Sequence, residues 1–349
     1  MKNSSLGWIL TFSLSIVVGS VHAQSGPHPQ MRQLEPLIGN WSLEGTAKFT
    51  PDASAMSWTG VATISRILDG HFVQEDLRLD IGMPTPLVYR TIYAWDPERR
   101  CFRTYGFGNN GEVRYCDVHW HDGKLLGSSQ SLEDGVPSFD RWVTVPSGDT
   151  QTFFVERCIA GGEPFRMLEG RATRAEEGFS LETESDVPAT APIPGSMKKL
   201  EFQLGRFRLT GEMQMMPGSP MVPVGATETI RSFLGGQVHY STIEGDPFPG
   251  TDIGYRGQVY LGWDARYGHY RALELGRFGE RIEYDVRPDG DKLVFTASTV
   301  LYGSPQLLRS IVTRTEGGGL HMVSHKATAS GDWERVFEST SEPVKTTTL

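Results

Sequence analysis

Alternating apolar and polar residues dominate the chain, and runs that would suit an amphipathic helix are scarce. Strand-like segments occur at 57–68, 88–95, 101–107, 112–120, 139–145 and 151–158. Gly, Pro, Asn and Asp separate them, which is typical of an antiparallel barrel or sandwich. We expect one helical turn, at 34–38, before the first strand.

The same pattern occurs twice. Residues 34–45 (LEPLIGNWSLEG) return as 200–211 (LEFQLGRFRLTG), an offset of 166, and Trp95-Asp96 returns as Trp263-Asp264 at an offset of 168. Each copy is long enough for a core of its own, so the repeat indicates a duplicated domain and not a solenoid. The predicted fold is all-β, with two tandem antiparallel up-and-down β-barrels.

The N-terminus has the features of a secretory signal peptide. Lys2 precedes an apolar run at 6–18, and Val21-His22-Ala23 resembles a cleavage site, so the mature chain would start at Gln24. The run is short for a membrane span, and we expect a periplasmic or secreted protein. The predicted order is signal peptide 1–23, lead-in 24–33, first barrel 34–178, linker 179–196, second barrel 197–343 and tail 344–349.

Composition narrows the possible partners. The formal net charge of −9 becomes −10 once Lys2 is removed, and no Lys/Arg run exceeds two residues. These values argue against nucleic acid, which basic patches bind. The 40 glycines and 21 prolines fit a chain with many turns. We expect no cofactor and no metal.

Four motifs in a fixed order carry a family resemblance. They are Leu-x-x-Leu-x-Gly-x-Trp at 34–41, Leu-Asp-Gly at 68–70, Trp-Asp-Pro at 95–97 and the closing segment 163–171. This set resembles the bacterial lipocalin-like family catalogued as domain of unknown function 1579. The resemblance implies a calycin-type barrel around a cavity, and it implies no activity. The second copy departs from the pattern at Phe207 and Ala265.

Comparing the copies suggests which side chains face the cavity. The apolar face Ile282, Tyr284 and Val286 maps onto Arg114, Cys116 and Val118. On the preceding strand, Leu273 and Leu275 map onto Tyr105 and Phe107. Arg103, two residues before Tyr105, would then also face inward. The candidate ligand-binding residues are Arg103, Tyr105, Arg114, Trp120, Arg141, Trp142, Arg271 and Arg309.

Two alternatives stay open for these residues. The arginines either anchor the acid group of an amphipathic or aromatic ligand or pair with the protein's own carboxylates, such as Glu156. Trp120 and Trp142 either line the cavity or pack between the barrels. Whether the barrels pack on each other is open too.

The leading hypothesis is an exported protein that binds a small, mainly apolar or aromatic molecule, with the first copy favoured as its site. The alternative is a cofactor-independent cavity enzyme of the lyase, isomerase, hydratase or cyclase type, whose acid–base groups no motif would reveal. A structural component of the envelope is a third interpretation. No residue is assigned a catalytic role.

Several motifs have plainer explanations. Residues 106–111 spell G-x-G-x-x-G but precede a strand, so they predict a hairpin loop and not a dinucleotide site. His119 and His121 are expected to face outward. The resemblance keeps haem as an alternative, since distant relatives of this barrel class bind haem through a late-strand His, and His321 and His325 lie near a late strand of the second copy.

Three cysteines remain. With a hairpin closing at 107–110, Cys101 and Cys116 would face each other and form a disulfide, as an exported protein allows. Cys158 would then be a buried thiol. Free thiols throughout are the alternative.

Overall fold

The computed structural model describes residues 26–133, 136–182, 187–214, 218–248, 250–301 and 304–344. The predicted signal peptide therefore lies outside the described residues. The chain divides into two compact units, Pro27–Pro192 and a second that begins at Ile193. No helix in the described ranges is long and apolar enough to cross a membrane.

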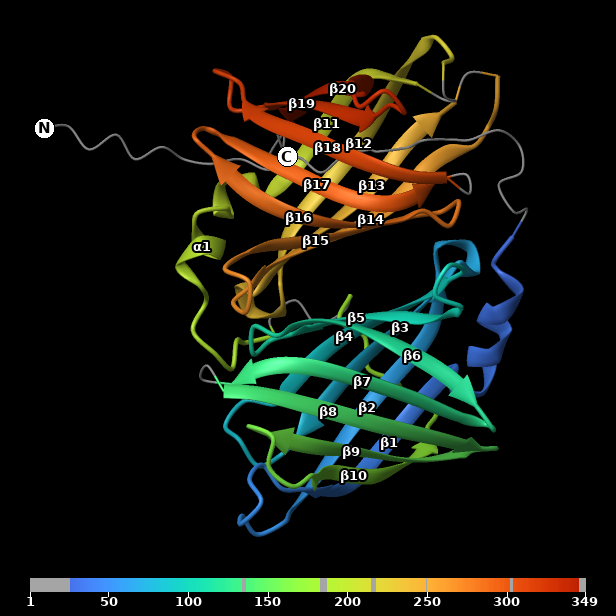
Figure 1. The fold of residues 1–349 in the computed structure, drawn as a ribbon, viewed down its shortest axis with the longest axis vertical. Helices are drawn as coiled ribbons and strands as arrows, with labels where there is room; N and C mark the ends of the chain where they lie inside the picture. The colour runs from blue at the N-terminus through green and yellow to red at the C-terminus, as the bar shows by residue number, and fades with distance from the viewer. Residues whose placement is uncertain are drawn as a thin grey trace, which may run out of the picture. The chain divides into compact units, whose positions relative to one another are not determined.

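The first unit holds a closed ten-stranded antiparallel barrel, called barrel 1 (Figure 1, blue to green). Its strands are β1 (Gly39–Ala47), β2 (Met56–Ile67), β3 (Phe72–Asp80), β4 (Leu87–Asp96), β5 (Cys101–Gly108), β6 (Val113–His121), β7 (Lys124–Glu133), β8 (Val136–Ser147), β9 (Thr150–Ile159) and β10 (Phe165–Arg174). Two 3₁₀ helices join them, η1 (Pro29–Leu37) and η2 (Leu68–Gly70).

The second unit holds barrel 2, closed in the same way (Figure 1, yellow to red). Its strands are β11 (Gly205–Gln214), β12 (Met221–Phe233), β13 (Val238–Pro247), β14 (Gly254–Asp264), β15 (His269–Gly276), β16 (Arg281–Asp289), β17 (Lys292–Leu301), β18 (Ser304–Arg314), β19 (Leu320–Ala327) and β20 (Trp333–Pro343). The short helices are α1 (Gly195–Lys198), η3 (Glu201–Gln203) and η4 (Leu234–Gly236). The predicted all-β fold of two tandem barrels is confirmed.

Helix η1 closes one end of barrel 1. Its Met31, Leu34 and Leu37 are buried in the core together with Trp41, the Trp of the first-strand motif. The Trp41 indole Nε1 donates to the Leu37 carbonyl oxygen at 2.8 Å. The Arg174 guanidinium lies 4.2 Å above the Trp41 ring. Trp41 therefore has a structural role, sealing this end of the barrel.

Both copies turn in the same way after their second strand. In η2 and η4, Asp69 has φ 58° and Gly235 has φ 68°, a left-handed conformation that Gly and Asp adopt most readily. The G-x-G-x-x-G segment forms the β5–β6 hairpin loop, with Gly111 at φ 84°. This loop leads into a strand, so it is not a dinucleotide fingerprint.

The chain that follows β10 is tied to barrel 1. Arg90, which is fully buried on β4, donates to the two Asp76 carboxylate oxygens at 2.7 and 2.8 Å. The same carboxylate accepts from the Leu181 amide at 3.0 Å, and Arg90 Nη1 donates to Glu182 at 2.8 Å. This part of the predicted linker is therefore anchored to the barrel surface.

Candidate functional site

The lumen of barrel 1 keeps accessible surface. Along β4, exposure alternates without exception: Leu87, Tyr89, Thr91, Tyr93 and Trp95 are partly accessible, and the residues between them are buried. Strand pairing places Tyr93 beside Val73 and Thr104, on the inner face of the sheet. The accessible side chains of this strand thus face into a closed barrel. A ten-stranded barrel is wider than one of eight strands, whose interior side chains can fill.

Aromatic rings line much of this lumen. Trp58 on β2 lies against Phe153 on β9, with ring centroids 5.8 Å apart. Two glycines between them on β1 and β10 make the contact possible, because a Cβ at Gly45 or Gly170 would come within 2.7 Å of the Trp58 ring. Trp142 on β8 lies over Gly127 of β7 in the same manner. The glycines create room for indole rings inside the barrel.

One carboxyl group faces this lumen without a basic partner among the described residues. Glu75 on β3 pairs in register with Thr91 and accepts a hydrogen bond from the Tyr93 hydroxyl at 2.8 Å. Burial raises the pKa of Glu75, and the Tyr93 hydrogen bond offsets this only in part. Burial likewise raises the pKa of Tyr93 well above its ordinary value.

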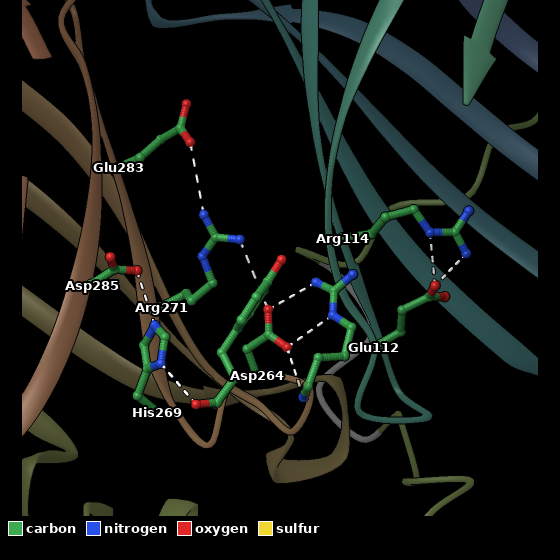
Figure 2. A network of polar contacts seen from close by, with 9 residues as sticks. Glu112, Arg114, Asp264, His269, Arg271, Glu283 and Asp285 are labelled. Carbon is green, nitrogen blue, oxygen red and sulfur yellow. Dashed lines mark hydrogen bonds and ion pairs between the residues drawn. The ribbon is translucent and has the colours of Figure 1, made fainter. Parts of the chain in front are cut away.

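The inward guanidinium groups are already paired. Arg114 donates from Nε to Glu112 at 2.7 Å, the pair that Figure 2 shows beside the β5–β6 loop. Arg157 donates two hydrogen bonds of 2.8 Å to the Asp140 carboxylate. Cys116, two residues after Arg114 on β6, also faces the lumen. Burial raises its pKa to about 11, so it is a neutral thiol at physiological pH.

Barrel 2 has its lumen filled. Val259, Leu261, Ile282, Tyr284 and Phe295 face inward and are each at most 2% exposed. At the offset of 168 they replace residues of barrel 1 that are polar or small, namely Thr91, Tyr93, Arg114, Cys116 and Gly127. The two barrels therefore share a topology. At these positions Thr91, Tyr93 and Arg114 of barrel 1 are partly accessible, whereas Cys116 and Gly127 are buried as their counterparts in barrel 2 are.

Barrel 2 retains acidic groups near one mouth. Glu274 accepts from the Tyr255 and Tyr284 hydroxyls at 3.3 and 3.2 Å. Burial raises the pKa of the neighbouring Glu280 to about 7. A pocket of about 330 Å³ opens beside Tyr255, lined also by Phe248, Val224 and the Arg208–Asp246 ion pair.

The predicted ligand-binding residues divide between the two faces of the sheets. Arg114, Trp120 and Trp142 face the lumen of barrel 1, as their register with Gly106, Leu125 and Gly127 shows. The other five lie on outer faces, namely Arg103, Tyr105, Arg141, Arg271 and Arg309.

The outer arginines have partners of their own. Arg103 pairs with Asp117 at 2.8 Å, and Arg141 donates to Glu156 at 3.1 Å, which is the pairing offered as the alternative from sequence. Arg271 lies 3.9 Å from Asp264 and 4.0 Å from Glu283 (Figure 2), and Arg309 stacks on Trp333 at 4.5 Å. Tyr105 packs edge-on against Tyr115 at 4.8 Å.

The predicted disulfide is absent, because Cys101 and Cys116 are both free thiols. The β5–β6 register pairs Thr104 with Cys116 and Phe102 with Val118, so Cys116 points inward and Cys101 outward. A bond between them would have to pass through the sheet. Cys158 is only partly buried and donates from Sγ to the Gly162 carbonyl oxygen at 2.9 Å.

The histidines singled out from sequence lie on outer faces of the two barrels. His119 and His121 are exposed on the outer face of β6, as predicted. His321 and His325 lie on the outer face of β19, where His321 pairs with Glu338 at 2.9 Å. Nowhere in the described ranges do three or more metal-ligating side chains gather.

Sequence reasoning named Arg114 but missed its partner Glu112, and it also missed Glu75, Tyr93 and Trp58. Their signal is a difference between the copies: Tyr93 and Arg114 correspond to Leu261 and Ile282.

Comparisons with known proteins give distant likenesses. A family model described as a protein of unknown function (DUF1579) matches residues 26–113, the first part of barrel 1. No curated protein matches the chain. The solved structure of Rv2717c from M. tuberculosis is 13% identical, with 43% of this chain and 99% of that one covered and a TM-score of 0.34.

Two further structures span both units. One is a Nostoc punctiforme protein of unknown function from the DUF3598 family, 12% identical, covering 91% of this chain and 100% of its own at a TM-score of 0.28. The other is from Bacteroides fragilis and is provisionally described as an outer membrane protein, with 12% identity, coverages of 90% and 99% and a TM-score of 0.21. These likenesses are too distant to assign an activity.

Proposed function

We propose that the protein is an exported, tandem lipocalin-like protein of the calycin type that binds a small, mainly apolar molecule in the lumen of barrel 1. The accessible inward face of β4 carries this proposal, because the equivalent inward positions of barrel 2 are filled. Trp58, Trp142 and Phe153 supply flat apolar walls, which are the usual lining of small-molecule sites. Barrel 2 then has a structural role and no ligand in its lumen.

The proposal is tested by filling the lumen. Leu77 faces inward on β3 and is partly accessible, so Leu77→Trp would occupy the space that the ligand needs. We expect this variant to lose binding of a panel of lipids and aromatic compounds, measured by quenching of tryptophan fluorescence. The matched control is Thr59→Trp, which adds the same ring to the exposed outer face of β2.

Two results would count against this function. One is wild-type protein that captures no member of the panel. The other is that Leu77→Trp and its control Thr59→Trp both bind as tightly as wild type. The binding site would then lie outside the lumen of barrel 1.

Export is the second part of the proposal. It is supported by the charge and hydropathy pattern of residues 1–23. N-terminal sequencing of the protein recovered from its host's periplasm or medium should give a chain that starts at Gln24. Retention of Met1 on protein found only in the cytoplasm would contradict export.

One observation favours a second candidate, a cofactor-independent acid–base enzyme. Glu75 is a lumen carboxyl with a raised pKa and a tyrosine partner, an environment in which carboxyl groups transfer protons near neutral pH. Turnover of a captured compound by wild type, with retained binding but lost turnover in Glu75→Gln, would favour the enzyme. Binding without conversion would favour the carrier.

A further inference from the structure

The chemical class of the ligand can be narrowed from the charges and donors of the barrel-1 lumen. This inference rests on the proposed function, and it asks what polar group the bound molecule carries. From sequence, an acid group held by arginine was one alternative, and pairing of the arginines with the protein's own carboxylates was the other. The structure provides the observations needed to test that answer.

Each inward arginine among the described residues of barrel 1 already has an acceptor. Arg114 and Arg157, the inward guanidinium groups between the barrel ends, are neutralised by Glu112 and Asp140. At the closed end, Arg66 pairs with Glu35, and Arg174 donates to the Ile38 carbonyl oxygen. Within the described part of barrel 1, a carboxylate ligand would therefore have to compete for a guanidinium group with an existing ion pair or, at Arg174, with the Ile38 carbonyl oxygen.

Glu75 makes an acid still less favourable. Its carboxyl faces the same lumen, and Tyr93 is the hydrogen-bond donor that the structure gives it. Two carboxyl groups that share a site cannot both ionise without a large cost, because each raises the pKa of the other. A ligand with an ionised acid would therefore be repelled as well as unpaired.

Unused hydrogen-bond donors point to an oxygen acceptor. Trp58 Nε1 and Gln151 Nε2 have no hydrogen-bond partner among the described residues, and their side chains are only 2% and 6% exposed. Trp58 faces inward beside Phe153, and Gln151 lies two residues before Phe153 on the same face of β9. Buried N–H groups without an acceptor are uncommon, because each costs about 1–3 kcal/mol.

We propose that the barrel-1 lumen selects a neutral molecule with an apolar body and a carbonyl, ester or ether oxygen, which accepts hydrogen bonds from Trp58 and Gln151. The aromatic walls hold the apolar body. The internal ion pairs and Glu75 discriminate against a free acid of the same shape.

The experiment compares two probes that share one body, 11-(dansylamino)undecanoic acid and its methyl ester. Dansyl fluorescence is titrated with full-length protein at pH 8, where the acid is ionised. The ester should bind at least about ten-fold more tightly than the acid, a difference of about 1.4 kcal/mol. Both titrations use the wild-type protein, so this comparison does not depend on whether a variant folds.

Two variants locate the hydrogen bond. Trp58→Phe keeps an aromatic ring and removes its N–H, so the ester should lose about three- to ten-fold in affinity and the acid should be unaffected. Trp333→Phe makes the same change at an exposed position in barrel 2 and should alter neither. Near-ultraviolet circular dichroism of each variant checks the fold.

The outcomes separate the two proposals. Equal or tighter binding of the acid overturns the inference and leaves the binding function standing, as does an ester affinity that Trp58→Phe does not change. Binding of neither probe overturns both proposals for ligands of this class.

Discussion

At the scale of single residues, the Asp76–Arg90 pair is a buried ion pair on which the folded state of barrel 1 depends. The two side chains are 3% and 0% exposed and also fix the chain after β10. A buried ion pair is a weak source of net stability when it is intact. Removing one partner is strongly destabilising, since the other charge is left uncompensated in the interior.

Asp76→Ala should lower the free energy of unfolding by about 3–5 kcal/mol, as measured by urea denaturation. The control is Asp117→Ala, which removes the partly exposed partner of Arg103 and Arg99 and should cost about 1 kcal/mol or less. A similar loss for both variants would show that the buried pair has no special role.

Residue-level prediction from sequence failed at strand β5 for a physical reason. Its outward residues Tyr105 and Phe107 are as fully buried as its inward Phe102, so alternation cannot distinguish the two faces. The hairpin register then differs from the assumed one by an odd number of residues, which moves Cys101 and Arg103 to the other face. Strand β6 was placed correctly, because its counterpart in the second copy alternates apolar Ile282, Tyr284 and Val286 with charged residues.

At the scale of the element, the loop before β6 and β16 has diverged between the copies. Glu112 and Glu280 are equivalent at the offset of 168, but Arg114 has become Ile282. Glu112 therefore has a guanidinium partner, whereas the donors that the described residues give Glu280 are the backbone amides of Phe278 and of Glu280 itself. This difference should give the two carboxyl groups opposite effects on stability.

The pKa of Glu280 is raised to about 7 in the folded protein, from an ordinary value near 4.5. Such a group favours the folded state below pH 4.5, and this contribution is lost as the pH rises to about 7. Glu280→Gln should therefore remove up to about 3 kcal/mol of the stability decrease between pH 4.5 and 8. Denaturant midpoints measured across this range test the expectation.

The matched change is Glu112→Gln in barrel 1. It leaves Arg114 inside the barrel without its carboxylate and should destabilise the protein at pH 7 by about 2 kcal/mol or more. Stabilisation by Glu112→Gln, or a steeper pH dependence in Glu280→Gln, would contradict this view of the two loops.

At the scale of the whole molecule, the barrels and their number followed from the repeat and the spacing of turn residues. The partly accessible inward face of β4 did not, since the packing inside a barrel depends on which face each residue takes. Gly127 and Phe295 illustrate this: one leaves space that Trp142 enters, and the other fills the lumen. A position-by-position comparison of the copies shows which side chains pack inside each barrel only once the strand register is known.

A bound molecule should therefore protect one barrel alone. At a free ligand concentration of about 100 times Kd, a single site adds about 2.7 kcal/mol to the stability of the state that binds it. Hydrogen exchange read by mass spectrometry, with and without the dansyl methyl ester, should slow in β1–β10. Slowing that is confined to β11–β20 would place the site in barrel 2.

The filled lumen of barrel 2 has a consequence for how this chain can change. Substitutions at its packed inward positions, such as Phe295, open cavities and cost about 3–5 kcal/mol each. The inward side chains of β4 are not fully packed, so several can change size without opening such a cavity. Substitutions are thus tolerated at the inward positions of barrel 1, where they would alter ligand choice. They are selected against at the packed inward positions of barrel 2, where they would unfold the protein. One duplicate can explore new ligands over generations, and the other preserves a fixed architecture beside it.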